Sequence, residues 1–294
     1  MTSQPSPLRL PPEIAAGYPF NPQRVATGGE WMSVAEAGDT AAPALLLVHG
    51  WPAWGWLWRK VIPEAAGKFR VIVPDMVGFG LSAKPPLSSH HSLERHTANL
   101  EELIGGLGVG RLTLVLHGSG GPIGLGWAAR HPEQVHRVVL VNTWLTPLPP
   151  ASWLMRLPGI EGRLRRLSGG MMHESAMLGY LAPLREHGAR QSLREFERMM
   201  RSPETERTLA QIANRLKELR APVEIVWGKQ DRLLPGPVPP YMLRDAFPNA
   251  SEPRWVAEAG HLVPEDAPEA LLEVLMAPFR PRPTKAGPLL RVLG

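Results

Sequence analysis

Polar and Gly-rich turns follow three short apolar runs in the first half of the chain. The runs end in His49-Gly50-Trp51-Pro52, in Pro74-Asp75 and in His117-Gly118-Ser119-Gly120-Gly121. The third turn approximates the Gly-x-Ser-x-Gly pattern, in which a sharp strand-to-helix turn exposes a serine for nucleophilic attack. Imidazole, carboxyl and hydroxyl groups placed in this way indicate acid–base or nucleophilic chemistry, with Ser119 as the candidate nucleophile.

These turns need a sheet to bring them together, and the apolar runs supply its strands. Residues 30–37 form a strand-like segment, and the continuous apolar runs 44–48, 69–73, 112–116, 138–141 and 223–227 are typical of strands buried on both faces. Helical spacing separates them, for example at Leu100, Leu103 and Leu107. We predict an α/β fold with a mostly parallel, doubly wound sheet, whose strand ends place the turns around one site.

The alternation of strands and helices stops near Thr143 and resumes at Pro222. The intervening segment has helix-like stretches at 153–167 and 193–200, and a clearer helix that begins at Ser202-Pro203. We therefore predict a core domain of residues 1–142 and 222–294, with an inserted helical cap of residues 143–221. Methionines of this cap, such as Met171, Met172 and Met177, either line an apolar cavity or fill the cap's own core.

Composition excludes several kinds of site. The chain has 294 residues, a formal net charge of +5 and no cysteine, so disulfides, thiolate nucleophiles and thiolate metal sites are excluded. The basic residues are scattered among acidic ones, and the sequence has no phosphate-binding Gly-rich loop and no metal-binding His motif. No apolar stretch is long enough to cross a membrane. We expect a cytoplasmic protein with a small-molecule substrate, no cofactor or metal, and no nucleic-acid or membrane partner; the oligomeric state is open.

Several ordered motifs between about residues 30 and 278 point to one family. They are His49-Gly50-Trp51-Pro52, Pro74-Asp75-Met76-Val77-Gly78-Phe79-Gly80-Leu81-Ser82-Ala83-Lys84-Pro85, Gly120-Gly121-Pro122-Ile123-Gly124, Gly228-Lys229-Gln230-Asp231 and Gly260-His261. In this order they resemble the motifs of the α/β-hydrolase family, within its haloalkane dehalogenase and epoxide hydrolase branch. The resemblance implies the α/β-hydrolase fold with an inserted helical cap.

The resemblance also implies an acid–base pair. In this family an acidic residue after one late strand orients a histidine after the next, and Asp231 and His261 match those positions. The carboxylate fixes the imidazole tautomer and stabilises the imidazolium that forms during proton transfer. His261 is thus the implied general base, and Asp231 the residue that orients it.

The nucleophile position departs from the family pattern. Where the dehalogenases carry His-Asp-Trp-Gly-Gly, this chain has Gly118 in place of the nucleophilic Asp and Ser119 in place of a halide-holding Trp. Trp51 stands where many of these enzymes use a halide-holding Asn. Carbon–halogen hydrolysis through a covalent ester needs the carboxylate and the halide donors together, so this reaction is not expected here.

Three functions are therefore open. The first is hydrolysis of a small, mostly apolar substrate, an ester or related acyl compound, with Ser119 attacking and the backbone amides of Trp51 and of the residue after Ser119 as oxyanion donors. If Ser119 does not attack, Gly118 relaxes the elbow, and His261 with Asp231 activates water directly. The second function is non-hydrolytic, such as a cyclase or lyase reaction that uses His261 for proton transfer. The third is a ligand-binding pseudoenzyme.

Overall fold

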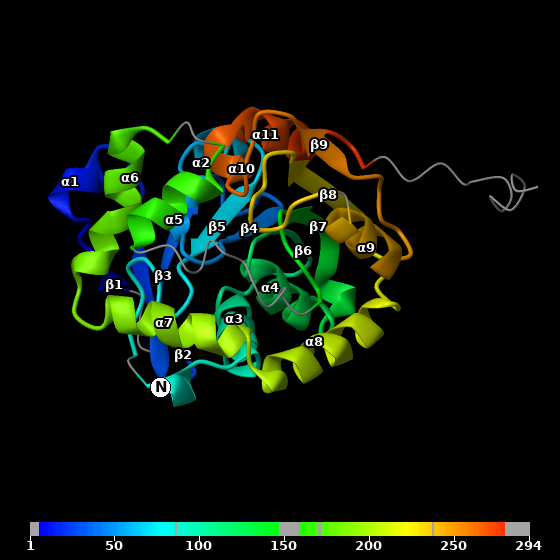
Figure 1. Cartoon of the computed structure of the whole chain (residues 1–294), viewed down its shortest axis with the longest axis horizontal. Coiled ribbons are helices and arrows are strands. Elements are labelled where there is room, and N and C mark those ends of the chain that lie inside the picture. Colours follow the sequence, from blue (N-terminus) through cyan, green and yellow to red (C-terminus); the bar gives the residue numbers. More distant parts are fainter. Residues whose placement is uncertain (1–5, 86, 147–158, 170–171, 237, 280–294) are drawn as a thin grey trace, which may run out of the picture.

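One continuous sheet organises the computed structural model, which describes residues 6–85, 87–146, 159–169, 172–236 and 238–279 (Figure 1). Within these ranges nine strands pair in the order β1-β2-β3-β5-β4-β6-β7-β8-β9. The strands from β5 to β9 in this order are parallel to one another, and β3, β2 and β1 extend the sheet beyond β5 with antiparallel pairing. The predicted α/β-hydrolase fold with a mostly parallel sheet is confirmed. The strands are β1 (Ser6–Pro7), β2 (Gln23–Thr27), β3 (Glu30–Ala37), β4 (Ala44–Val48), β5 (Arg70–Pro74), β6 (Leu112–His117), β7 (Val135–Val141), β8 (Val223–Gly228) and β9 (Arg254–Val256).

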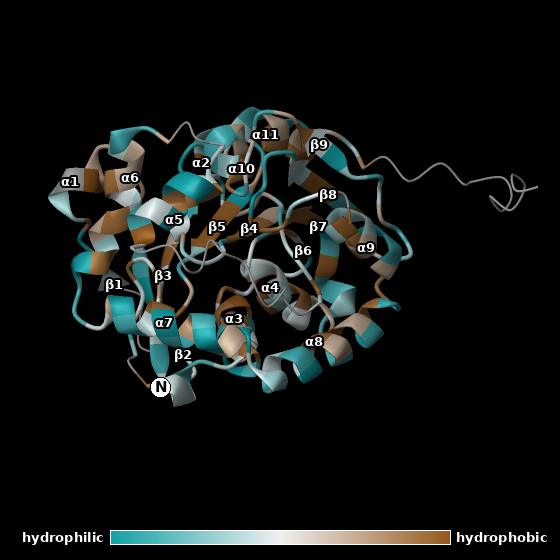
Figure 2. Cartoon of the chain, viewed as in Figure 1, coloured by the Kyte–Doolittle hydropathy of each residue, from teal (hydrophilic) through white to brown (hydrophobic). Residues whose placement is uncertain are grey.

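The central strands carry continuous apolar runs because helices cover both faces of the sheet. Every residue of β4 and of β6 is buried, whereas β2, which lies next to the edge strand β1, alternates between partly buried and exposed residues up to its buried last residue. Figure 2 shows the same contrast, with hydrophobic colour along the inner strands and hydrophilic colour on the outer surfaces of the helices. The sequence pattern is therefore strongest for the strands that carry the polar turns at their ends.

Helices connect the strands and begin where the sequence provides caps. The Ser92 side chain accepts the N–H of Arg95 at the start of α3, and Ser202 accepts the N–H of Thr205 at 3.1 Å at the start of α8, as predicted from Ser202-Pro203. The helices are α1 (Pro12–Ala15), η1 (Gly55–Trp58), α2 (Ile62–Ala65), η2 (Ser88–His90), α3 (Leu93–Gly106), α4 (Gly120–Ala128), η3 (Pro132–Gln134), α5 (Ile160–Leu167), α6 (Glu174–Leu181), η5 (Ala182–Arg185), α7 (Ala189–Met200), α8 (Pro203–Leu216), α9 (Val238–Ala246), α10 (Val263–Asp266) and α11 (Pro268–Met276).

The helices α5 to α8, which we call the inserted helices, lie between β7 and β8 in the chain. They pack on the remainder of the protein at several places: α6 contacts α1 and η1, α7 contacts η2, and α8 contacts α3 and α4. Residues 153–158 of the predicted first helix, together with Met171, lie outside the described residues. Met172 and Met177 belong to the continuous hydrophobic core, which favours a packing role for them.

Buried polar side chains gather where the parallel strands end. His49 follows β4, Ser119 follows β6, Asn142 follows β7 and Asp231 follows β8, and all of them are buried. Parallel strands bring their carboxyl ends to one edge of the sheet, so these groups lie close together. No helix of the described ranges has the length and apolarity that a membrane span requires.

Candidate active site

Asp231 and His261 form a buried hydrogen-bonded pair. His261 Nδ1 lies 2.9 Å from Asp231 Oδ2, and neither side chain is more than 1% exposed. The other carboxylate oxygen, Oδ1, accepts the backbone N–H groups of Leu233 at 2.8 Å and of Leu234 at 2.9 Å. The structure thus places the two residues as the sequence predicts, with the carboxylate fixed by the turn after β8.

The surroundings of Asp231 favour its ionised form. Burial by itself raises the pKa of the Asp231 carboxyl, but His261, the Asn142 amide and the backbone N–H of Leu234 together lower it below its ordinary value. The carboxylate is therefore charged at neutral pH, which allows it to hold the Nδ1 proton of His261 and leaves Nε2 to accept a proton.

Asn142 is a site residue that the sequence interpretation missed. Its Nδ2 donates to Asp231 Oδ2 at 2.6 Å, and its Oδ1 accepts the N–H of Gly228 at 3.1 Å. Its backbone is left-handed, with φ of 42°, a conformation that asparagine adopts more readily than most residues. A polar residue directly after the buried run 138–141 was the available signal.

Gly118 keeps the sharp turn of a nucleophile elbow but presents no side chain. It lies between β6 and α4 with φ of +53°, and a Cβ atom added to it would lie 3.2 Å from Nε2 of His261. Its N–H donates to the carbonyl of Val141 at 3.2 Å, and its own carbonyl accepts the Thr143 hydroxyl at 2.5 Å. A residue here would aim its side chain at the imidazole, so the geometry of attack is retained without an attacking group.

Nε2 of His261 is buried and has no hydrogen-bond partner among the described residues. The main chain of His261, by contrast, is held on both sides: its N–H donates to the carbonyl of Leu167 at 2.7 Å, and its carbonyl lies 2.9 Å from Nε2 of His117. Burial lowers the pKa of His117 to about 3, so this ring is neutral and can donate. The imidazole of His261 is therefore positioned with one nitrogen free.

Ser119 lies beside this pair without joining it. Its Oγ accepts the backbone N–H of Trp51 at 2.7 Å, and no hydrogen bond links it to His261 in the described part of the chain. The structure therefore brings Ser119 and Trp51 together, and it does not bring Ser119 Oγ to the base. The Trp51 amide, expected as an oxyanion donor, is already used by that hydroxyl.

The remaining residues of the motif after β4 support the turn. His49 Nε2 accepts the N–H of Met76 at 2.9 Å, and burial lowers the pKa of His49 to about 4. The backbone of Gly50 packs closely on the turn between β6 and α4, since a Cβ atom on Gly50 would lie 2.6 Å from the backbone nitrogen of Ser119. Pro52 is buried. These residues shape the backbone beside the base and carry no proton chemistry at neutral pH.

Asp75 supports its own loop. Its two carboxylate oxygens accept the backbone N–H of Gly55 at 2.7 Å and of Leu81 at 2.8 Å. Burial raises the pKa of Asp75 to about 6. These contacts agree with the interpretation of this residue as a loop-binding carboxylate.

An apolar cavity of about 360 Å³ adjoins the turn after β8 that holds Asp231, and neither His261 nor Gly118 is among the residues that line it. Leu233 and Leu234, whose amides bind Asp231, line it, as does Trp144, which follows the threonine bonded to Gly118. Its other walls include Leu145, Pro235 and Met242. This volume suits a small, mostly apolar ligand.

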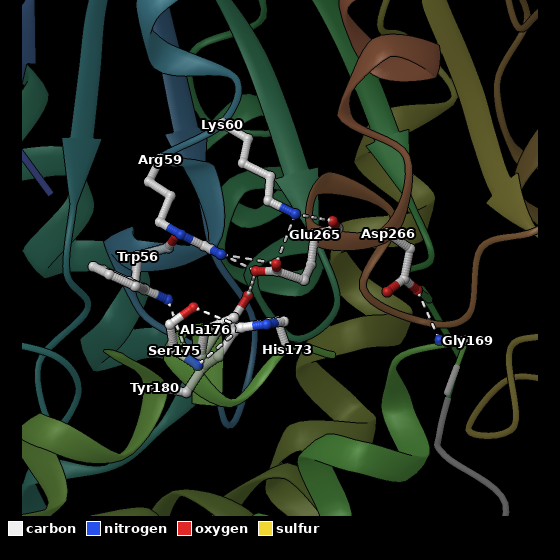
Figure 3. Close-up of polar contacts among 10 residues, drawn as sticks. All are labelled: Trp56, Arg59, Lys60, Gly169, His173, Ser175, Ala176, Tyr180, Glu265 and Asp266. Carbon is white, nitrogen blue, oxygen red and sulfur yellow. Dashed lines mark hydrogen bonds and ion pairs between the residues drawn. The ribbon is translucent and has the colours of Figure 1, made fainter. Parts of the chain in front are cut away.

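Helix α10, which follows His261, connects the base loop to the inserted helices (Figure 3). Glu265 accepts two hydrogen bonds from Arg59, at 2.5 and 2.8 Å, and one from the Tyr180 hydroxyl of α6 at 2.9 Å. Asp266 Oδ2 accepts the N–H groups of Gly169 at 2.9 Å and of Gly260 at 2.8 Å. The loop that carries His261 is thus braced from the core and from α5 and α6.

Metal ligands do not cluster in the part of the chain that the structure describes. No group of three or more His, Cys, Asp or Glu side chains there could hold a metal ion.

Comparison with known proteins agrees with this fold. The family model for the α/β-hydrolase fold matches residues 43–167. A cis-3-alkyl-4-alkyloxetan-2-one decarboxylase of Shewanella oneidensis is 30% identical over 256 residues, which cover 78% of this chain and 79% of the relative. The chain belongs to the α/β-hydrolase family.

Two further similarities refine its place in the α/β-hydrolase family. A cis-3-alkyl-4-alkyloxetan-2-one decarboxylase of Xanthomonas campestris is 39% identical over 142 residues, about half of each chain (46% of this one, 47% of the relative). The tetrameric haloalkane dehalogenase DpaA of Paraglaciecola agarilytica superimposes with a TM-score of 0.79 at 25% identity and covers 92% of this chain and 96% of its own. This α/β-hydrolase lies in the haloalkane dehalogenase-like branch, as its motifs indicate.

Proposed function

We propose that this protein is a hydrolase of a small, mostly apolar ester, in which His261 and Asp231 activate a water molecule beside Gly118. The observation that carries the proposal is the free Nε2 of His261, buried and facing the position where the family's nucleophile stands. A water hydrogen-bonded to that nitrogen takes the space that a side chain at residue 118 would fill.

The reaction needs no covalent intermediate. Nε2 removes a proton from the water as its oxygen bonds to the ester carbonyl carbon, and Asp231 stabilises the imidazolium that results. The carbon–oxygen bond to the alcohol then breaks, and the imidazolium returns the proton to the leaving oxygen. General base catalysis of this kind contributes about 10²–10⁴ in rate. The backbone N–H of Ser119, the residue after the nucleophile position, is the proposed oxyanion donor.

A strained cyclic ester is the substrate that fits best. The two decarboxylase relatives are named for oxetan-2-ones, which are four-membered cyclic esters carrying alkyl groups. Ring strain makes their carbonyl carbon reactive enough for attack by water, and the cavity of about 360 Å³ is apolar enough for alkyl groups. We propose that the inserted helices cover this substrate. Hydrolysis would convert the ring to a 3-hydroxy acid.

The role we propose for Ser119 is to hold the Trp51 amide. Its hydroxyl is 2.7 Å from that nitrogen, and attack by Ser119 would need reorientation away from this bond toward His261. The Ser119→Ala variant should therefore keep most of its turnover.

The test is turnover of a cis-3,4-dialkyl oxetan-2-one in H₂¹⁸O, followed by mass spectrometry of the products. Wild type should give 3-hydroxy acid with the label in its carboxyl group. His261→Ala should lose at least 10² in rate, while the exposed control His136→Ala and the Ser119→Ala variant should not. A fluorophosphonate should leave the mass of the intact protein unchanged. An adduct that disappears in Ser119→Ala, or full activity in His261→Ala, would sink the proposal.

The names of the two relatives favour a second candidate, decarboxylation of the same lactone. Loss of CO₂ breaks the C2–C3 and O1–C4 bonds and leaves an alkene, so no water is consumed. The same experiment separates the two: unlabelled alkene and CO₂ indicate a lyase, and labelled 3-hydroxy acid indicates a hydrolase. Tight binding of the lactone without any product would indicate a binding protein.

A further inference from the structure

A second pocket, lined by cationic side chains, adjoins the candidate site. It has a volume of about 230 Å³ and lies between α5 and α7, with Trp51 as one wall. Arg163 of α5 and Arg190 and Arg194 of α7 contribute its positive charge. Because the Trp51 amide binds Ser119 of the elbow, this residue lies between the basic pocket and the turn that faces the base.

Arg190 and Arg194 are the unpaired cations of this pocket. Its carboxylate, Glu197, already pairs with Arg163 at 3.2 Å and with Arg201 at 3.4 Å. Arg190 and Arg194 are exposed, and no described residue forms an ion pair or hydrogen bond with either of them. Two like charges four residues apart on one helix face repel each other, so the helix gains nothing from them by itself.

The two arginines also line a neighbouring hollow of about 420 Å³. It adds Lys84 and Arg185 to the positive charge, and its carboxylate, Glu186, pairs with Lys84 at 3.2 Å. The two hollows together hold five cationic side chains against two carboxylates, and both carboxylates are paired. A concave surface of one charge sign concentrates ions of the opposite sign.

We propose that the ester taken by this site carries an anionic group, a carboxylate or a phosphate, which binds between Arg190 and Arg194 while the ester lies at His261. The inference rests on the proposed function and adds to it the charge of the substrate. Arginine matches both anions, because its planar group donates two parallel hydrogen bonds to two oxygens. A pocket of about 230 Å³ accommodates one such group with part of its chain. The alkyl part then passes Trp51, which suits an apolar segment between two polar ends.

The experiment compares oxetan-2-ones whose 3-alkyl chain ends in methyl, carboxylate or phosphate, over chain lengths of four to twelve carbons. The variant is Arg190→Gln/Arg194→Gln. The control is Arg207→Gln/Arg220→Gln, which removes the same charge from exposed arginines that line neither hollow.

The paired arginines should act on binding rather than on the chemical step. With Arg190→Gln/Arg194→Gln, the KM for the anionic lactones should rise about tenfold at low salt, with kcat unchanged. The methyl-ended lactones should be unaffected, and the control should match wild type. In wild type the anionic series should show an optimum chain length that the variant loses. Whichever of the carboxylate-ended and phosphate-ended lactones shows the larger change in KM carries the anionic group that the site recognises. Equal changes across all three chain ends, or none, would overturn the proposal.

A binding measurement tests the anion site independently of the proposed hydrolysis. Calorimetric titration with octanedioate and with inorganic phosphate needs no turnover. If no lactone is converted but octanedioate or phosphate binds to wild type and not to Arg190→Gln/Arg194→Gln, the anion site stands and the proposed reaction falls. If neither anion binds to wild type and no anionic lactone is preferred, the anion site is disproved.

Discussion

Replacing Gly118 by alanine tests the position of the attacking water most directly. Nε2 of His261 would lie 3.2 Å from the added methyl carbon. A water hydrogen-bonded to that nitrogen needs its oxygen at about 2.9 Å, in the same space. The methyl group therefore displaces the water, and lactone turnover should fall by about 10²–10⁴, the contribution of general base catalysis.

The same substitution has a conformational cost that must be separated from the loss of activity. Alanine at φ of +53° costs about 1–2 kcal/mol in the left-handed region, or a few degrees in Tm. Gly108 offers a matched control: its φ is +61°, it is exposed, and a Cβ there would meet nothing within 4 Å. Gly108→Ala should lower Tm by a similar amount and keep full turnover.

The assay is ¹H NMR of the lactone ring protons at a temperature well below either melting transition, with Tm measured for each protein. If Gly118→Ala turns over the lactone within twofold of Gly108→Ala, no essential water lies between Gly118 and His261. Attack by a water held in the space beside Gly118 would then be refuted, whatever the other variants show.

Three further predictions concern the carboxylates around the base. Asp231→Asn should reduce turnover by about 10³–10⁴, because an amide cannot stabilise the imidazolium, and adding His261→Ala should reduce it little further. Glu265→Gln should lower the free energy of unfolding by about 3 kcal/mol, measured by urea denaturation, because it leaves the mostly buried Arg59 without its charge partner. Burial raises the pKa of Asp266 to about 6 from 3.8, so its contribution to stability is full below pH 4 and is lost as pH rises through 6. Asp266→Asn should therefore raise Tm relative to wild type at pH 8 and lose this advantage at pH 4.

Exposed carboxylates provide the controls for the two stability predictions. Glu161→Gln removes one partner of a surface pair with Arg165 and should leave the urea midpoint unchanged. Asp245→Asn, at a side chain that is 61% exposed, should show no pH-dependent difference in Tm. A Glu265→Gln variant as stable as wild type would mean that the contacts of α10 do not brace the base loop. A constant Tm difference for Asp266→Asn from pH 4 to pH 8 would contradict the raised pKa.

The sequence predicted the parts of the fold in which one physical signal dominates. The strands at 30–37 and 44–48 were predicted to the residue, and the second carries the unbroken apolar run expected of a strand covered on both faces. The short outer strands β1, β2 and β9 were missed, because strands at or next to an exposed edge need no such run. The helix α7 begins at Ala189, four residues before the predicted start at Leu193, since its first turn carries little apolar signal.

The candidate site was predictable in its residues and not in its contacts. The positions of Asp231 and His261 follow from their motifs, and the structure joins them at 2.9 Å. The partner of Ser119 could not be predicted, because the direction of a side chain at a tight turn depends on backbone angles that the sequence does not specify. Asn142 escaped notice for a related reason: its function is to hold Asp231, which lies 89 residues away in the chain.

The backbone hydrogen bond from His261 to Leu167 links two equilibria. Leu167 ends α5, and the same loop is held again through Asp266 and Gly169. Separating α5 from the loop therefore requires breaking the bond that fixes the base. The free energy of packing α5 against the loop therefore contributes to the free energy of orienting the His261 imidazole. The amide proton of His261 exchanges with solvent only when α5 has moved away and the bond to Leu167 is broken. Its deuterium exchange rate therefore reports the population of molecules in which α5 is separated from the loop of His261, with or without a bound ligand.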